Sequence, residues 1–241
     1  YKGFCDYTYV EGEYKEIYKR NLAEFDLLIR DPHLAKIVSQ VKKYCEGYGW
    51  VDSIISYDTP FGISSNVKSS TKKTIEVVEK KDNKHSIAIY HIEKQKRKKE
   101  YISEADVVKN MQDISKYKVL LTGAAGSGND PYVLGKPIIA DQNSVCSQSY
   151  LYVAFDDLIQ ANNFVKYLKT KTFRALVASM KTTQSCPNRV YKYVPLFNFS
   201  NYEIINWNLS IQEIDNQLFK LFEMDVDSIA YIKNRFKYFE D

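Results

Sequence analysis

Residues that build metal and nucleophile sites are scarce in this sequence. It has four cysteines and three histidines among 241 residues, with no Cys-x-x-Cys pair. The cysteines are Cys5, Cys45, Cys146 and Cys186, and the histidines are His33, His85 and His91. A structural zinc site brings four such ligands together at short, paired spacings, so the sequence predicts no metal ligand. The thiols are expected to be free and buried in a reducing compartment.

Long apolar runs are absent as well. No stretch approaches the roughly 20 apolar residues that a membrane-spanning helix needs, and no secretory signal pattern opens the chain. We therefore expect no membrane partner and a cytoplasmic protein. The sequence begins at Tyr1 instead of Met, so we expect a piece of a longer polypeptide.

A large surplus of one charge sign is also missing, because the net charge is only +4. This value excludes a histone-like basic tail, and a nucleic-acid partner would require the cations to gather on one face. With 44% hydrophobic and 27% charged residues, the composition is that of a folded globular protein with one large or two small domains. The 20 tyrosines are expected mainly in strands and buried edges, with base stacking as the alternative.

Two strings resemble ligand-binding motifs but lack their defining residues. Residues 120–128 have the glycines of a phosphate-binding loop but no Gly-Lys-Ser/Thr, and Asn129-Asp130-Pro131 breaks the helix that would follow. We expect a flexible loop that closes over a partner. Residues 129–132 resemble the Asn/Asp-Pro-Pro-Tyr motif of amino-methylating DNA methyltransferases, but one proline and the upstream cofactor loop are missing, so we interpret the match as a coincidence. No nucleophile elbow is present, and the sequence predicts no catalytic residue.

The periodicities predict an α+β fold. Mixed or antiparallel strands occupy the N-terminal two thirds, followed by a long basic helix and a helical C-terminal tail. Strands are expected at residues 50–57, 117–121 and 149–155, and a pair of strands at residues 74–78 and 86–92 around the polar turn Lys80–Lys84. A hairpin near Gly12, a short helix from Ser103 to about Ser115 and a short strand ending at Pro195 are also expected. Helices are expected after Asp31-Pro32, from Asp157 to about Met180, after Ser210 and after Asp225. The run Lys94–Lys99 is either a solvated loop or a phosphate-facing edge.

Several strings, in order along nearly the whole chain, resemble one protein family. The most informative lie within residues 170–197, with Thr183-Gln184 and Tyr193-Val-Pro195. Others are residues 25–32 and the loop Pro60-Phe-Gly-Ile-Ser-Ser-Asn66, where Ile63-Ser64 replaces a more usual Leu-Arg. This set resembles the C-terminal half of type IIG adenine-specific restriction–modification methylases, which contains a target recognition domain that reads DNA.

The resemblance implies a division of the chain into two parts. Residues 1–30 would be a hairpin root, the end of a preceding methyltransferase domain, and residues 31–241 would be the DNA target recognition domain. The partners implied are double-stranded DNA and that preceding domain. S-adenosylmethionine would bind the full-length parent, with no cofactor in this chain. The catalytic domain would flip the target base while this part holds the duplex.

Polar residues in the matching loops are the candidate DNA contacts. Candidates for reading base edges are Gln184, Asn188 and Arg189, and candidates for binding phosphates are Lys68, Lys72, Lys73, Lys181 and Lys192. Ser64, Asn66 and Thr183 lie in the same loops. A solvated surface position is the alternative for each. If about five cations meet phosphates, log affinity should fall against log salt with a slope of about −4 to −5.

A compact metal-dependent DNA nuclease remains the alternative function. Such enzymes need an acidic pair with a nearby lysine, which Glu76-Val-Val-Glu-Lys80 fits only loosely. A surface strand explains that string better. Cleavage of DNA during a divalent-metal titration would separate the two functions.

Overall fold

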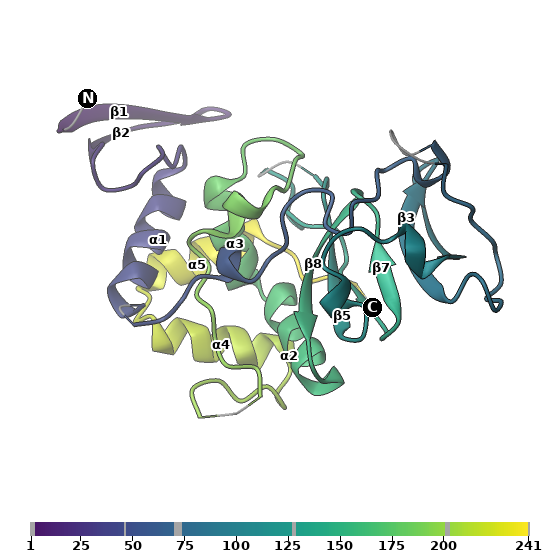
Figure 1. The fold of residues 1–241 in the computed structure, drawn as a ribbon. Coiled ribbons are helices and arrows are strands. Elements are labelled where there is room, and N and C mark those ends of the chain that lie inside the picture. Colours follow the sequence, from purple (N-terminus) through teal and green to yellow (C-terminus); the bar gives the residue numbers. More distant parts are fainter. Residues whose placement is uncertain (1–2, 46, 70–73, 127–128, 201–202, 241) are drawn as a thin grey trace.

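The computed structural model describes residues 3–45, 47–69, 74–126, 129–200 and 203–240. It confirms the predicted α+β class, with antiparallel and mixed sheets and a helical C-terminal part. Figure 1 shows a hairpin standing apart at one end, a group of helices beside it, and two small sheets at the other end. No described helix has the length and hydropathy needed to cross a membrane.

The N-terminal hairpin forms where the sequence predicts it. Strand β1 (Phe4–Glu11) pairs antiparallel with β2 (Tyr14–Asn21), and Glu11 lies opposite Tyr14 across the turn. Gly12 occupies that turn with φ of 59°, a left-handed conformation that glycine adopts without strain. The base of the hairpin is held by Arg20, whose guanidinium donates to the Ile29 carbonyl at 2.7 Å.

Local capping signals correctly predicted three helices. Helix α1 (Pro32–Tyr44) starts at Asp31, whose carboxylate accepts the first free backbone N–H groups. Helix α4 (Ile211–Leu221) has the capping box of Ser210 and Glu213, and helix α5 (Val226–Arg235) starts at Asp225. Each cap satisfies backbone donors that have no partner inside the helix.

The single long helix expected at residues 157–180 is two helices, α2 (Leu158–Lys169) and α3 (Lys171–Met180). Thr170 breaks it with an extended conformation, and its hydroxyl accepts from the Phe173 N–H. The fully buried Asp215 carboxylate accepts from the backbone N–H groups of Lys171 and Thr172, at 2.8 and 2.9 Å. A carboxylate from α4 thus completes the new N-terminus of α3.

The cations expected to decorate that helix are partly internal. Arg174 is fully buried, and its guanidinium donates to the carbonyls of Thr170, Pro131 and Tyr132. Lys166 donates to the Trp207 carbonyl at 2.6 Å. These side chains stabilise the packing of loops against the helices, because they satisfy carbonyls that would otherwise lack donors.

One sheet, here called the central sheet, lies between the helices and the second sheet and has the order β6-β5-β8. Strand β5 (Tyr117–Thr122) pairs antiparallel with both β6 (Ile138–Ala140) and β8 (Tyr150–Phe155), so the strands expected at residues 117–121 and 149–155 are confirmed. Its side chains alternate between two cores. Val119 and Leu121 face the core shared with the helices, whereas Leu120 faces the core shared with the second sheet.

The second sheet has the order β4-β3-β7 and is mixed. Strand β3 (Ile87–Glu93) pairs antiparallel with β4 (Lys96–Ile102) and parallel with β7 (Ser144–Cys146). The predicted pairing of residues 74–78 with residues 86–92 was wrong, because β3 turns directly into β4 through Lys94 and Gln95. Both turn residues have positive φ, so the basic run Lys94–Lys99 is a hairpin turn and an edge strand instead of a loop.

Three further expected elements differ. Residues 50–57, expected as a strand, instead contain a 3-10 helix (Val51–Ser53). The short strand expected before Pro195 is reduced to a single β-bridge between Trp50 and Pro195. Residues 103–115 hold two 3-10 turns, Glu104–Asp106 and Met111–Asp113, where one helix was expected. Further 3-10 helices occupy Val67–Ser69 and Asn188–Tyr191. Pro195 has no N–H to continue a ladder, so the pairing there stays short.

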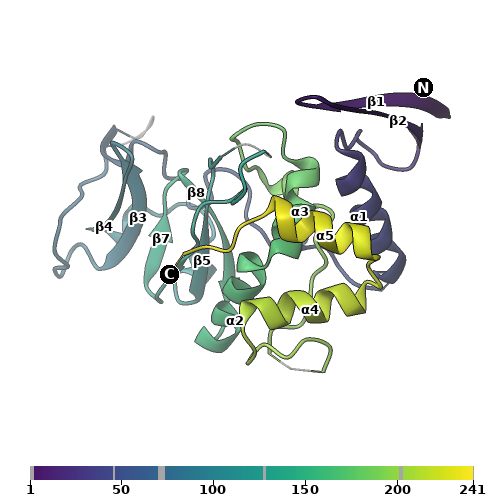
Figure 2. The ribbon, with the colours of Figure 1, turned by 180° about the vertical axis from the view of Figure 1, so that it is seen from behind.

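The C-terminal segment crosses back from the helices towards the central sheet (Figure 2). The Lys237 N–H donates to the Pro131 carbonyl at 3.1 Å, and the Phe239 ring stacks on Tyr132 with centroids 5.7 Å apart. Arg174 lies against the same ring, 4.8 Å from its centroid. The C-terminal segment therefore packs against Pro131 and Tyr132.

Candidate functional site

Two loops that are distant in sequence and that both carry family-like strings line one depression, here called the central groove. Its volume is about 900 Å³. Tyr57, Asp58 and Ser65 come from the first loop and Ser185 to Arg189 from the second, with Ile92, Gly123, Ala124, Gln148, Ser149 and Leu151 completing the lining. The site is therefore a meeting of the loop of residues 57–65 with the loop that follows α3.

The first loop is anchored by its own apolar residues. Phe61 and Ile63 are fully buried in the core of the second sheet, and the Phe61 ring stacks on Tyr152 with centroids 4.8 Å apart. Between them, Gly62 has φ of 79°, which turns the chain so that both neighbours point inward. The Gln148 N–H donates to the Ile63 carbonyl at 2.9 Å. The residue types of the Pro-Phe-Gly-Ile string thus fix where the polar residues after it emerge.

The second loop is held by backbone hydrogen bonds to the glycine-rich segment. The Ala125 N–H donates to the Gln184 carbonyl, and the Cys186 N–H donates to the Gly123 carbonyl, both at 2.9 Å. Burial raises the pKa of the Cys186 thiol, so it stays protonated near neutral pH and is no nucleophile. Residues 184–186 are thus fixed by backbone hydrogen bonds, and the exposed side chains of this loop project from a rigid support.

Asn188 and Arg189 both line the central groove, as the predicted base contacts require, but their side chains differ in hydrogen bonding and exposure. The Asn188 amide donates to the carbonyls of Asp52 and Ile55, at 2.6 and 2.7 Å, so it joins the two loops. Arg189 is exposed. Its guanidinium is the side chain in this groove best suited to meet an acceptor-rich ligand.

Gln148 and Asp58 form a polar pair within the groove. The Gln148 amide donates to the Asp58 carboxylate at 3.0 Å. Sequence reasoning missed this pair, together with Tyr57 and Ser65. Tyr57 and Asp58 are separated from the Pro-Phe-Gly string only by Thr59, so the residues flanking that string could have been considered as candidates.

A second depression, the side hollow, borders the central groove. Its volume is about 560 Å³, and it is lined by Ser53 to Pro60, Lys109, Asn110, Asp113, Lys116, Tyr152 and Ala154. The Tyr152 hydroxyl donates to the Asp113 carboxylate at 2.7 Å, and burial together with this bond raises the pKa of Tyr152. Lys116 lies 3.2 Å from the other Asp113 oxygen, whereas Lys109 is exposed. Tyr57 and Asp58 belong to both depressions and so separate them.

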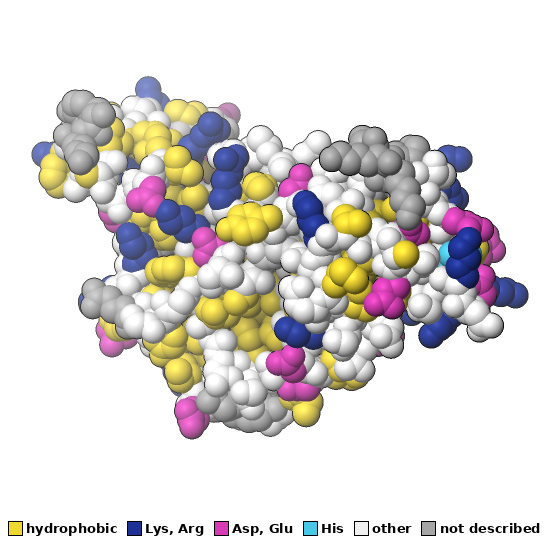
Figure 3. All heavy atoms as spheres, viewed as in Figure 1, with side chains coloured by type: hydrophobic (Ala, Val, Ile, Leu, Met, Phe, Trp, Pro, Cys, Tyr) yellow, Lys and Arg dark blue, Asp and Glu magenta, His cyan; other side chains and the backbone are white. Residues whose placement is uncertain are grey.

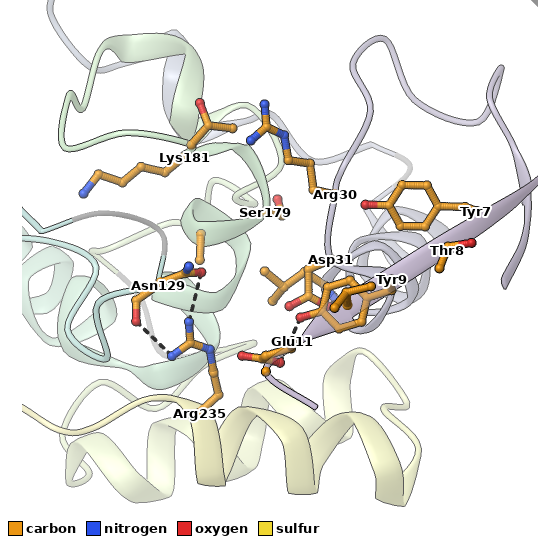
Figure 4. Close-up of a pocket in the computed structure, with 15 residues that line it drawn as sticks. Tyr7, Thr8, Tyr9, Glu11, Arg30, Asp31, Asn129, Ser179, Lys181 and Arg235 are labelled. Atoms are coloured by element: carbon orange, nitrogen blue, oxygen red, sulfur yellow. Dashed lines mark hydrogen bonds between the residues drawn. The ribbon is translucent and has the colours of Figure 1, made fainter. Parts of the chain in front are cut away.

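Lys181 lies elsewhere, beside a third depression between the hairpin and the helices. Only 3% of this residue is exposed, and its ammonium donates to the carbonyls of Ala125, Gly126 and Val133. Figure 4 shows its side chain directed away from the hairpin. In this arrangement the ammonium binds backbone and is not presented to a phosphate.

The remaining predicted residues are scattered. Lys192 forms an ion pair with Asp26, which raises the pKa of the lysine, and Lys68 lies 3.8 Å from Glu93. The Ser64 hydroxyl donates to the Asn66 carbonyl at 2.9 Å, the Thr183 hydroxyl accepts from the Ser185 N–H at 3.2 Å, and the Gln184 side chain is exposed. Lys72 and Lys73 lie outside the described residues. Contact with DNA stays a prediction for all of them.

The third depression, here called the hairpin cleft, has a volume of about 620 Å³. Figure 4 shows Tyr7, Tyr9 and Glu11 on the hairpin side and Asn129 and Arg235 on the opposite side. Arg235 donates to the Asn129 carbonyl at 2.9 Å and to its side-chain oxygen at 3.3 Å. The cleft therefore mixes both charge signs, with internal partners already in place.

Cations are dispersed on the face shown in Figure 3, where Lys and Arg alternate with Asp and Glu. Within the described ranges, no three His, Cys, Asp or Glu side chains gather in a way that could hold a metal ion. The string Glu76–Lys80, considered for a nuclease, has Glu76 paired with Lys84 at 2.5 Å and with His85 at 3.4 Å.

Comparisons with known proteins give similarities to solved structures but not to sequence families. No protein-family model and no characterised protein matches the sequence. Among solved structures, the chain is similar to the crystal structure of the type IIG restriction endonuclease BpuSI, with a TM-score of 0.41 and 12% identity. The match covers 92% of this chain and 35% of that one, so the chain spans about a third of that protein's length.

Proposed function

We propose that this chain is the DNA target recognition part of a bacterial restriction–modification adenine methyltransferase. It would hold the duplex for base flipping by a catalytic domain outside this chain. The observation that carries the proposal is the meeting of the loop of residues 57–65 with the loop of residues 185–189 around the central groove. These loops overlap the family-like strings at residues 60–66 and 170–197, and nothing in the sequence spacing of those strings requires them to lie side by side.

The chemistry of the groove suits a nucleic acid. Reading a base needs donors and acceptors on fixed supports, and holding a backbone needs cations beside them. The backbone hydrogen bonds at Gly123 and Ala125 and the Asn188 amide hold the loops rigidly. Arg189, which lines the central groove, would bond a guanine edge, and Lys109 in the adjoining hollow would bind a phosphate.

The proposal also assigns the hairpin to the preceding methyltransferase domain. The exposed hydrophobic side chains of this end of the chain include Phe4 and Val10 on β1, Ile17 on β2, and Leu27 and Leu28 beyond it. A two-stranded hairpin of this kind is not stable on its own, and its outer face would be covered by the domain it ends. Residues 31–241 would then form the recognition domain.

S-adenosylmethionine would bind in that preceding domain. Residues 129–132 are poorly suited to the chemistry of the methyltransferase motif they resemble, because the Tyr132 ring is stacked on Phe239 and the Asn129 carbonyls accept from Arg235. We therefore expect no methyl transfer by this chain alone. Micromolar binding of S-adenosylmethionine to the isolated chain, measured by calorimetry, would contradict this assignment.

The direct test is binding of fluorescently labelled duplex DNA at several salt concentrations, read by anisotropy. We expect binding at low salt that weakens as salt rises. In the full-length parent, Arg189→Ala and Gln184→Ala should each reduce discrimination between cognate and scrambled duplexes by about 1–3 kcal/mol if they touch bases. Lys192→Ala is the matched control, because the loss of a phosphate contact would weaken binding to both duplexes and leave the discrimination unchanged.

Two results would redirect the proposal. An absence of DNA binding at low salt would remove the DNA role. Cleavage of DNA that depends on an added divalent metal would favour the nuclease alternative, and the same anisotropy samples can be analysed for cleavage products.

A further inference from the structure

Tyr57 combines high exposure with a rigid backbone. Its exposed fraction is 79%, among the largest for the hydrophobic side chains of the chain. Burying an aromatic ring is normally favourable, so an aromatic side chain left this open contributes little to folding. Its backbone is nevertheless fixed on both sides.

Strand β8 holds the residue before it. The Ser56 N–H donates to the Tyr152 carbonyl, and the Tyr152 N–H donates to the Ser56 hydroxyl, both at 2.9 Å. The residue after it, Asp58, accepts from the Gln148 amide at 3.0 Å and from the Thr59 N–H at 2.9 Å. Tyr57 is thus presented on a support that costs little additional ordering when a ligand binds.

The surroundings of Tyr57 match those of a stacked base. It stands between the central groove, which contains Arg189, and the side hollow, which contains Lys109 and Lys116. Cations on both sides of an exposed ring can bind the phosphates that flank a base lying on that ring. Every nucleobase has a flat face, so such a contact needs no particular sequence.

We propose that Tyr57 stacks on a DNA base that has left the duplex stack. This inference rests on the proposed DNA-binding function and names a binding residue for it. An aromatic face that covers such a base lowers the free energy of the opened duplex.

The test compares two probes of the same length and sequence context. One is a short fully paired duplex, and the other carries a single unpaired 2-aminopurine as a bulge. We expect the wild-type chain to bind the bulged probe more tightly and to quench its fluorescence, because stacking quenches this base. Tyr57→Ala should lose about 5- to 150-fold in affinity for the bulged probe and little for the paired probe.

Two variants make the result specific. Tyr57→Phe keeps the ring and should keep the preference and the quenching. Tyr14→Ala makes the same change at another exposed tyrosine, 47% exposed on the hairpin, and should leave both probes unaffected. Since Tyr57 is so exposed, the melting temperatures of Tyr57→Ala and Tyr57→Phe should equal that of the wild type.

The outcomes distinguish a failure of the stacking role of Tyr57 from a failure of the proposed DNA-binding function. If the wild type binds neither probe at low salt, the DNA-binding function itself fails. If the wild type binds but shows no preference for the bulge, or if Tyr57→Ala keeps the preference, only the stacking role is overturned. An equal loss in Tyr57→Phe and Tyr57→Ala would also overturn it, because the hydroxyl and not the ring would then make the contact.

Discussion

Replacing Lys181 by methionine would remove its ammonium while keeping most of the length of its side chain. In the structure this ammonium donates to three backbone carbonyls, with separations of 2.6 Å to Val133 and 3.4 Å to Ala125 and a further bond to Gly126. Sequence reasoning made the same lysine a phosphate contact. The structure leads us to expect that Lys181→Met destabilises the fold and leaves the salt dependence of DNA binding unchanged.

The size of the effect follows from burial. Val133 is fully buried, so water cannot replace the lost donor at its carbonyl, and an unsatisfied buried acceptor costs roughly 1–3 kcal/mol. Ala125 and Gly126 are partly exposed, and water replaces part of the lost bonding there. Relief from burying a charge offsets some of the loss. We expect the free energy of unfolding to fall by about 2–4 kcal/mol, which a typical domain with about 5–15 kcal/mol can tolerate.

Urea unfolding followed by circular dichroism measures this change, and anisotropy at several salt concentrations measures DNA binding. Lys109→Met is the matched control, because Lys109 is exposed and its replacement should shift the free energy of unfolding by no more than about 0.5 kcal/mol. If Lys181→Met leaves stability unchanged and lowers the salt slope by about one, Lys181 meets a phosphate and our reasoning from burial is wrong.

The other predictions concern backbone conformation, the pH dependence of stability, and the effect of replacing Arg189 on melting temperature and DNA binding. Gly62→Ala should destabilise the chain by about 2 kcal/mol in urea unfolding, because its φ of 79° strains other residues and an added methyl group would collide with Val108. Gln95→Gly should raise the free energy of unfolding by about 1 kcal/mol in the same assay, because φ of Gln95 is 64°, a left-handed value that glycine adopts without strain. An unchanged unfolding midpoint would contradict this. Burial lowers the pKa of Lys118 to about 8 from 10.5, so between these values the unfolded chain binds the additional proton. The unfolding free energy of the wild type should therefore rise with pH relative to that of Lys118→Met, and parallel pH profiles would refute the assignment. Arg189→Ala should leave the melting temperature unchanged while weakening DNA binding, and a lowered melting temperature would indicate a structural role.

Local signals predicted the elements that depend only on neighbouring residues. The capping residues Asp31, Ser210 and Asp225 start helices because they bond to N–H groups within three residues of themselves. The hairpin at Gly12 likewise needs only a turn residue that tolerates positive φ. Such interactions can be read from a short window of sequence.

Long-range contacts decided the elements that were wrong. The break at Thr170 is completed by Asp215, which is 44 residues from Lys171 in sequence, and no local pattern reveals that partner. The β3–β4 turn uses Lys94 and Gln95 where hairpins favour Asn and Gly, so the polar segment 80–84 was the more persuasive turn.

The candidate site was predicted in part for the same reason. The sequence named both loops, but their meeting depends on bonds such as that from Asn188 to the Asp52 carbonyl, 136 residues away. Lysine is rarely buried, so Lys181 was predicted at the surface. In the structure its ammonium is buried and donates to three backbone carbonyls. Tyr57 carries no motif of its own, and only its exposure between two depressions singles it out.

Strand β5 couples the unfolding of the two cores. Leu120 packs into one core, whereas its neighbours Val119 and Leu121 pack into the other. Unfolding of either core would therefore disturb β5 and expose apolar side chains that the other core buries. We therefore expect the two halves to unfold together in a single transition. Heat or denaturant would then abolish the central groove all at once, with no stable remnant in which one of its loops survives alone.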